Sequence, residues 1–213
     1  MAEPWLIVVG GFLGAGKTTL LIAAARLLAA RGVRVALVLN DQGGELVDTR
    51  WASIAGVAAG EVTGGCFCCR LSDLLRAADR LLAEHSPEVL LAEPVGSCTD
   101  ISATVLNPLA RDFPGRFRLA PFTVLVDPER ARRLLASEAD PNLRFLFLNQ
   151  IEEADLVCFS KSDVHAEVPA LPHPAVRRLS AKTGEGVAAW LDEILGGSLP
   201  AAARLLSIDY EYY

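Results

Sequence analysis

The chain has 213 residues, of which 52% are hydrophobic and 22% charged, and it carries a formal net charge of −6. A sequence pI near 5.1 argues against a nucleic-acid partner, because a surface that follows phosphates is basic. No apolar stretch approaches the roughly 20 residues of a membrane span, since Arg26 interrupts the run that begins at Leu20. The first strand is expected almost at the N-terminus, which leaves no room for a signal peptide. We therefore expect one cytoplasmic domain over residues 1–213, without a membrane partner.

Apolar runs that suit buried parallel strands alternate with stretches of helical period along the chain. Strands are expected at residues 5–9, 33–39, 57–62, 89–92, 122–126, 156–159, 176–179 and 205–208. Helices are expected at residues 16–30, 71–85, 99–110, 128–136, 142–154 and 187–195. Three prolines within residues 164–174 indicate a loop. This alternation predicts an α/β fold of three layers with a mostly parallel central sheet.

The segment from Gly11 to Thr18 has the spacing G-x-x-x-x-G-K-T between a predicted strand and a predicted helix. Its glycines let successive backbone N–H groups point at one anionic centre, and the N-terminus of the next helix adds positive charge. Lys17 can reach the β- and γ-phosphates of a nucleotide, and the Thr18 hydroxyl can ligate Mg²⁺. A glycine-rich turn without a ligand is the alternative. The spacing and its context favour a nucleotide-binding protein with the P-loop NTPase fold.

Acidic residues follow two further predicted strands, at the edge where an α/β sheet places its ligands. Glu93 is interpreted as the Walker-B carboxylate that holds Mg²⁺, and the Gly96 N–H as a sensor of the γ-phosphate. Asp41 or Glu45 could contact Mg²⁺ directly or through water. Ordinary loop solubility explains these two residues equally well.

Two motifs near the C-terminal end indicate guanine as the base: Lys161 with Asp163, and Ser180-Ala181-Lys182 after the next strand. A carboxylate such as Asp163 can accept from both guanine N1–H and the exocyclic amine. Adenine lacks that pair of donors and would leave the acceptor unpaired. The aliphatic stem of Lys161 would cover the base. The Lys-x-Asp motif is weak alone, but together with Ser-Ala-Lys after the next strand it is a strong indication.

Five cysteines, an odd number, do not indicate a disulfide framework in a cytoplasmic chain. Cys66, Cys68 and Cys69 fall within four residues, and thiolates favour Zn²⁺, Cu(I) and related metals. A turn must bring the three together, because they cannot share one face of a strand. They supply at most three ligands to a tetrahedral ion, which leaves a position for water, a carboxylate or a client protein. Redox chemistry through Cys66 and Cys69 and buried structural thiols are the alternatives. Cys98 and Cys158 are interpreted as plain core or loop residues.

These motifs together resemble the CobW-type metal-chaperone GTPases, relatives of the hydrogenase and urease nickel-insertion GTPases, over nearly the whole chain. The matching segments are the phosphate loop, Gly65–Cys69 (GCxCC), Glu93–Gly96 (ExxG) and residues 150–155 followed by Ser160–Asp163. The resemblance implies slow GTP hydrolysis to GDP and phosphate, coupled to delivery of Zn²⁺, or next Co²⁺, to a client metalloprotein; a homodimer is left open. It implies catalytic roles for Lys17 and Glu93. The residues that it implies for nucleotide binding are Gly11, Gly14, Ala15, Gly16, Lys17, Thr18, Thr19, Gly96, Lys161, Asp163, Ser180, Ala181 and Lys182.

The chain departs from the family pattern in three places. Ser160 stands where Asn is usual, which removes an amide that braces the base and predicts lower GTP affinity, with selectivity retained by Asp163. Asp41 stands where Glu is usual. Similar members often continue beyond the position of Tyr213 into a smaller C-terminal domain, which we expect to be absent here or supplied by another chain.

Two other classes of function stay open at this point. A small-molecule P-loop kinase would need an acceptor pocket and a lid of arginines. Arg130, Arg132 and Arg133 cluster, but their helical spacing is typical of a solvated face. A nucleotide-gated switch would bind metal without delivering it. No arginine finger or water-positioning Gln is evident in the sequence, so turnover without a partner is expected to be slow.

Overall fold

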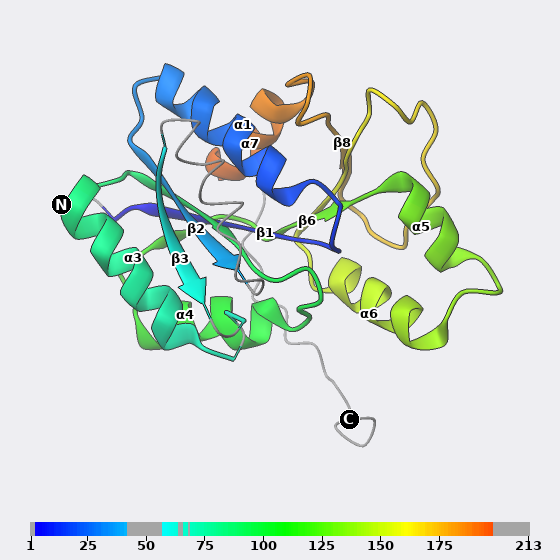
Figure 1. Cartoon of the computed structure of the whole chain (residues 1–213), viewed down its shortest axis with the longest axis horizontal. Helices are drawn as coiled ribbons and strands as arrows, with labels where there is room; N and C mark the ends of the chain where they lie inside the picture. The colour runs from blue at the N-terminus through cyan, green and yellow to red at the C-terminus, as the bar shows by residue number, and fades with distance from the viewer. Residues whose placement is uncertain (1–2, 42–56, 64–65, 68, 198–213) are drawn as a thin grey trace.

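A parallel sheet with helices on both faces forms the centre of the computed structural model (Figure 1). The structure describes residues 3–41, 57–63, 66–67 and 69–197. The strands are β1 (Trp5–Gly10), β2 (Val35–Asp41), β3 (Ala58–Thr63), β4 (Val89–Glu93), β5 (Arg118–Leu119), β6 (Thr123–Val126), β7 (Leu156–Phe159) and β8 (Val176–Arg178). The helices are α1 (Lys17–Ala30), α3 (Leu71–His85), the π-helix η1 (Ser102–Leu106), α4 (Asn107–Asp112), α5 (Pro128–Leu135), α6 (Pro141–Glu152) and α7 (Val187–Leu195).

All strand pairs among these residues are parallel, in the order β3-β2-β4-β1-β6-β7-β8, with β5 also beside β1. The predicted three-layer fold with a mostly parallel sheet is therefore confirmed. Parallel strands end at one edge, so the loops after β1, β4, β7 and β8 meet there. In the described ranges, no helix is long and apolar enough to cross a membrane.

Alternate side chains of β1 pack into two separate cores. Leu6 and Val8 face the layer that contains α3, α4 and α6, whereas Ile7 and Val9 face α1 and α7. Figure 1 shows α1 and α7 on one side of the sheet and α3, α4 and α6 on the other. Because both faces are covered, β1 reads as a continuous apolar run, as the sequence predicted.

Most predicted elements are confirmed to within two residues, and the helix expected at 99–110 is the main exception. It begins three residues later as η1, where Asn107 N–H donates to the carbonyl of Ser102, and continues as α4. Pro108 explains the widened turn, because proline has no N–H for the carbonyl of Thr104 and its ring crowds that carbonyl. The strand at 118–119 is too short to give a period and was not predicted. The strand expected at 205–208 lies outside the described residues.

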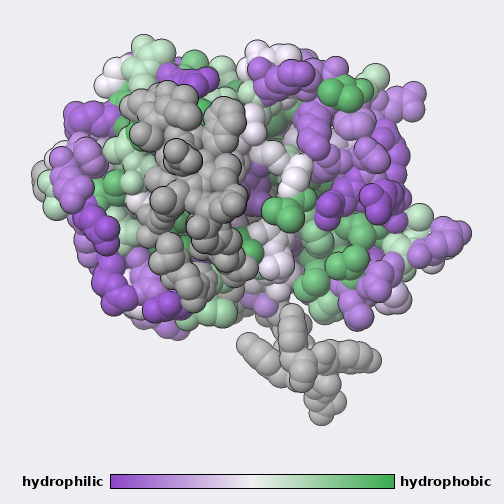
Figure 2. Space-filling view, viewed as in Figure 1, coloured by the Kyte–Doolittle hydropathy of each residue, from purple (hydrophilic) through white to green (hydrophobic). Residues whose placement is uncertain are grey.

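The described surface is hydrophilic over much of the face in Figure 2, while hydrophobic side chains gather over α6. Leu143 and Phe145 of α6 are each 47% exposed, whereas Phe147 and Ile151 of the same helix are buried. The inward side of α6 therefore belongs to the core, and its other side adds apolar surface to the molecule.

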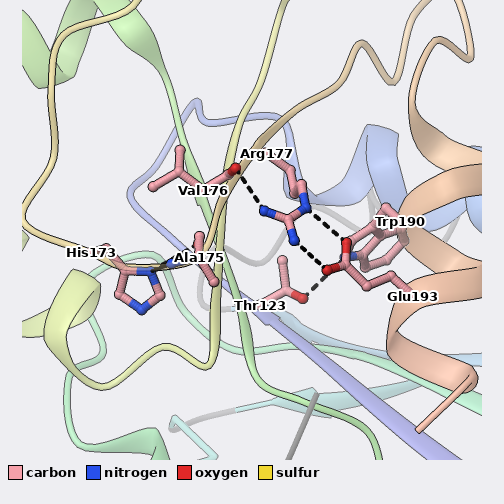
Figure 3. Close-up of polar contacts among 7 residues, drawn as sticks. All are labelled: Thr123, His173, Ala175, Val176, Arg177, Trp190 and Glu193. Atoms are coloured by element: carbon pink, nitrogen blue, oxygen red, sulfur yellow. Dashed lines mark hydrogen bonds and ion pairs between the residues drawn. The ribbon is translucent and has the colours of Figure 1, made fainter. Parts of the chain in front are cut away.

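Helix α7 is joined to the sheet by two polar contacts (Figure 3). The indole N–H of Trp190 donates to the hydroxyl of Thr123 over 3.1 Å, and both side chains are buried. Arg177 of β8 donates two hydrogen bonds to Glu193 of α7, over 3.0 and 2.6 Å. These contacts hold α7 against β6 and β8, and the loop at 180–182 follows β8 at the carboxyl edge of the sheet.

Candidate nucleotide and metal site

The phosphate loop turns between β1 and α1 through three glycines with positive φ, a backbone conformation that favours glycine. Gly11 has a φ of 127°, and a Cβ built on it would lie 2.2 Å from the carbonyl oxygen of Leu125. Gly16, with a φ of 93°, precedes the first residue of α1, and no described side chain caps that helix end. The backbone N–H groups of the loop and of the first helical turn thus form the arrangement that binds phosphate.

Glu93, at the end of β4, contacts two residues of this loop. The hydroxyl of Thr18 donates to Glu93 Oε2 over 2.8 Å, and the ammonium of Lys17 lies 3.6 Å from Glu93 Oε1. Lys17 is only 5% exposed. The two oxygens at 2.8 Å match the roughly 3 Å edge of an octahedron with Mg–O bonds of about 2.1 Å. The residues present therefore fit Mg²⁺.

The loop after β4 lies directly against the phosphate loop. A Cβ on Gly96 would lie 2.6 Å from the backbone nitrogen of Leu13, so only glycine permits this approach. Gln150 of α6 supports the loop from behind, because its buried amide donates to the carbonyls of Gly96 (3.1 Å) and Cys98 (2.8 Å). The sequence had placed Gln150 in a family motif without a role. Its two hydrogen bonds show that Gln150 positions the loop after β4.

The predicted base-reading residues come together around one hollow of about 320 Å³. It is lined by Ala15, Gly16, Thr19, Ser160, Lys161, Asp163, Val164, Ser180, Ala181 and Lys182. Asp163 accepts a hydrogen bond from the buried hydroxyl of Ser180 over 2.6 Å, and this bond lowers the pKa of the Asp163 carboxyl below its ordinary value. Asp163 is thus an ionised acceptor at the mouth of a pocket that continues from the phosphate loop.

Asp127 contacts a lining residue of this hollow, and the sequence did not indicate it. The ammonium of Lys161 forms an ion pair with Asp127, at the end of β6. Burial raises the pKa of Asp127, but hydrogen bonds from Lys161 and from the Arg130 backbone N–H outweigh burial and lower it overall. In the sequence, the signal that could have indicated Asp127 was its position as an acidic residue directly after a predicted strand. The hydroxyl of Ser160 donates to the carbonyl of Val126 over 3.3 Å, so it braces the neighbouring strand.

Arg130 lies closer to the phosphate loop than its predicted role on a solvated face implied. Its guanidinium lies 5.6 Å from the ring centre of Phe12, within the range of a cation–π contact. The side chain is exposed, so the solvated position is confirmed. A cation therefore stands beside the loop that binds phosphate.

The cysteine segment makes the tight turn that its spacing required. The N–H of Cys69 and that of Arg70 both donate to the carbonyl of Cys66, over 3.1 and 3.0 Å. Asn40 anchors the turn, because its side chain accepts from the Phe67 N–H over 3.1 Å and donates to the carbonyl of Val62 over 3.0 Å. Cys66 is 7% exposed, whereas Cys69 is exposed.

Three predicted metal-binding positions cannot be placed. Cys68, Glu45 and the side chain of Asp41 lie outside the described residues. Within the residues that the structure describes, no group of three His, Cys, Asp or Glu side chains is placed to hold a metal ion. The predicted use of Cys66, Cys68 and Cys69 therefore remains a prediction.

The interpretation of Cys98 as a plain core or loop residue is wrong. The structure joins Cys98 to Cys66 through a disulfide, with the Cα atoms 7.3 Å apart. The strand order explains the meeting, because β2 lies between β3 and β4 and the loops of the outer two converge over its end. Cys158, by contrast, is confirmed as a core residue of β7, where burial raises the pKa of its thiol.

Glu153 is a second residue that the sequence did not single out. It follows α6, is 1% exposed, and its Oε2 accepts from the Ser102 N–H over 3.1 Å. Burial raises the pKa of this carboxyl to about 8, the Ser102 hydrogen bond opposes that, and the charge of Asp100 raises it further. Glu153 thus connects α6 to the segment that follows the Gly96 loop.

Comparison with known proteins agrees with this geometry. The family model described as CobW/HypB/UreG, nucleotide-binding domain, matches residues 5–184. Zinc chaperone CobW of Pseudomonas aeruginosa is 29% identical over 230 residues, covering 87% of this chain and 58% of the relative. Zinc chaperone YjiA of Escherichia coli is 28% identical over 180 residues, covering 81% and 53%. The chain thus spans about half the length of the curated relatives it matches.

Solved structures share the fold at low sequence identity. HypB from Helicobacter pylori in complex with nickel superposes with a TM-score of 0.68 at 19% identity, covering 92% of this chain and 87% of that one. Zn(II)-bound YjiA GTPase from Escherichia coli gives 0.53 at 22% identity, covering 78% and 52%. At these identities the likeness shows the fold alone.

The buried Glu153 carboxyl predicts a pH-dependent cost to stability. An ordinary Glu in the unfolded chain loses its proton near pH 4.5, whereas folded Glu153 keeps it until about pH 8. Stability relative to Glu153→Gln should therefore fall as pH rises through this window. We expect Glu153→Gln, which retains an acceptor for Ser102, to raise the free energy of unfolding at pH 8 by more than about 1.4 kcal/mol, the equivalent of one pKa unit.

Urea unfolding at pH 5 and pH 8 measures this difference. The control is Glu152→Gln, an exposed neighbour on α6, which should have no comparable pH-dependent effect. An equal effect of Glu153→Gln at both pH values would show that burial does not hold the proton on Glu153.

Proposed function

Because the chain belongs to the CobW/HypB/UreG family, we propose that it is a GTP-binding and GTP-hydrolysing metallochaperone. The observation that carries the proposal is the position of the loop that begins at Glu93. Glu93 contacts Lys17 and Thr18 of the phosphate loop, and Cys98 of the same loop meets Cys66. One short segment thus connects the nucleotide site to a thiol site.

The described residues divide the binding of GTP among three loops. Backbone N–H groups of the phosphate loop and the Lys17 ammonium would hold the β- and γ-phosphates, while Thr18 and Glu93 would hold Mg²⁺. Bound Mg²⁺ supplies positive charge against the negative charge that develops on the phosphates. Asp163, fixed by Ser180, would accept from guanine N1–H and the exocyclic amine. The Lys161 stem would cover the base while Asp127 positions its ammonium.

Hydrolysis joins one water to the γ-phosphorus as the bond to GDP breaks, which gives GDP and phosphate. Lys17 offsets charge in the transition state, and the Gly96 loop lies where it would sense loss of the γ-phosphate. Arg130 lies beside the phosphate loop, but its guanidinium contacts the Phe12 ring and its side chain is exposed. Slow turnover that a partner accelerates is consistent with this position.

We propose Zn²⁺ as the cargo metal, with Co²⁺ as the second candidate. Thiolates of the segment from Cys66 to Cys69 would bind it and pass it to a client metalloprotein. The support for zinc is chemical and comparative: thiolates suit Zn²⁺, and two relatives are named zinc chaperones. A metal site that is linked to GTP hydrolysis suits delivery of the metal better than permanent binding.

Guanine selectivity tests the role of Asp163. We expect GTP and GDP to bind at least tenfold more tightly than ATP and ADP, a difference of about 1.4 kcal/mol. Asp163→Asn should reduce this preference, because its amide presents a donor to one of the guanine donors. Displacement of a labelled GDP measures both effects, with Asp192→Asn on the surface of α7 as the matched control. Equal displacement by ATP and GTP in the wild-type protein would refute the assignment.

Hydrolysis and its Mg²⁺ dependence test the role of Glu93. Glu93→Gln should slow GTP hydrolysis by more than about tenfold and raise the Mg²⁺ concentration needed for half-maximal rate, while GDP binding stays nearly unchanged. Phosphate release across a Mg²⁺ titration gives both quantities. The control is Glu88→Gln, just before the other end of β4, where Glu88 pairs with Arg34 on the surface. A Glu93→Gln protein with wild-type turnover would remove Glu93 from the magnesium site.

A further inference from the structure

We propose that Cys98 is a ligand for the cargo metal, acting together with Cys66. This inference rests on the proposed metallochaperone function and adds a residue from a different loop to its metal site. Neither the GCxCC segment nor the sequence around Cys98 had indicated the pairing. It follows from the fold, which brings residues 32 positions apart in the chain into contact.

The spacing of the two backbones suits a shared metal ion. The Cα atoms of Cys66 and Cys98 are 7.3 Å apart, beyond the 4.4–6.8 Å that is usual for disulfides. Two thiolates on one tetrahedral zinc, each with a Zn–S bond of about 2.3 Å, lie about 3.8 Å apart. The separation of the backbones is thus better matched to sulfurs that hold an ion between them. The pair supplies two of the four positions of such a site.

The backbone beside each cysteine is held in place by a hydrogen bond with another element of the fold. The turn that contains Cys66 is anchored where the Phe67 N–H donates to Asn40, and Phe67 itself is fully buried. The carbonyl of Cys98 accepts from the Gln150 amide over 2.8 Å. Because the backbone already positions the two sulfurs close together, binding a metal would cost less conformational entropy than it would on flexible loops.

The position of Cys98 also connects the metal to the nucleotide. Cys98 lies two residues after Gly96, whose backbone lies against Leu13 of the phosphate loop. Gln150 holds the carbonyls of Gly96 and Cys98 together. A displacement of this loop on loss of the γ-phosphate would therefore move one metal ligand relative to the other. Cys66 lies on a different segment, in the turn that follows β3 in the chain.

The oxidised pair must be reduced before it binds metal. A phosphine reductant and one water convert the disulfide into two thiols, with oxidation of the phosphine to its oxide. Zn²⁺ then displaces the two thiol protons to solvent. Because a phosphine carries no thiol, it does not introduce a competing thiolate into the measurement.

The test compares Cys98→Ala with Cys158→Ala, which removes a buried cysteine from β7. The full chain is reduced with the phosphine, and Zn²⁺ affinity is measured by competition with a chromophoric chelator. Co²⁺ binding is followed through its thiolate-to-metal charge-transfer absorption. We expect Cys98→Ala to weaken Zn²⁺ binding at least tenfold and to lower the charge-transfer absorption per bound Co²⁺. Cys158→Ala should match the wild type, and GDP binding by all variants confirms that they are folded.

Cys66→Ala distinguishes failure of this inference from failure of the proposed function. If Cys66→Ala weakens Zn²⁺ binding and Cys98→Ala behaves like Cys158→Ala, Cys98 is not a ligand and only the inference is overturned. If wild type, Cys66→Ala and Cys98→Ala all bind Zn²⁺ alike, the metal site of the proposed function fails as well. A loss in both variants, with reduced charge-transfer absorption in each, supports the pair.

Discussion

The carboxylate of Glu93 is the interaction on which the candidate site depends. It faces the nearly buried ammonium of Lys17 and accepts from the hydroxyl of Thr18. A buried cation needs a partner, because its desolvation is costly when it is left unpaired. The pairing fixes the end of β4 against the start of α1. The loop that continues from Glu93 is thereby held beside the phosphate loop, where glycine at position 96 allows backbone to touch backbone.

The order of the strands then decides which functional groups lie next to each other. Because β4 lies between β1 and β2, its loop faces the phosphate loop on one side and the ends of β2 and β3 on the other. The first neighbour brings Lys17 and Thr18, and the second brings Asn40 and the cysteine turn. The base pocket forms separately, at the ends of β7 and β8, and α7 fixes its last strand. A nucleotide would thus lie along the carboxyl edge of the sheet, from the phosphate loop to the base pocket. The thiols lie on the other side of the phosphate loop, after β3 and β4.

The sequence could predict what depends on local pattern, and it missed what depends on strand order. The phosphate loop and Glu93 could be assigned because spacing and a preceding apolar run define them. The pairing of Cys98 with Cys66 could not, since nothing in either segment tells that β2 separates β3 from β4. Asp127 escaped notice because a single acidic residue after a strand is common. Glu153 escaped because its unusual proton affinity arises from burial, which a helical pattern does not reveal.

The proposed coupling of nucleotide and metal through the loop after β4 can be measured as GTP-analogue affinity with and without Zn²⁺. Coupling between two sites is reciprocal and commonly amounts to about 1–3 kcal/mol. We expect Zn²⁺ to change the affinity for a non-hydrolysable GTP analogue severalfold relative to GDP, and Cys98→Ala to remove the difference. Identical ratios of analogue to GDP affinity with and without Zn²⁺, in wild-type protein shown to bind both, would contradict it.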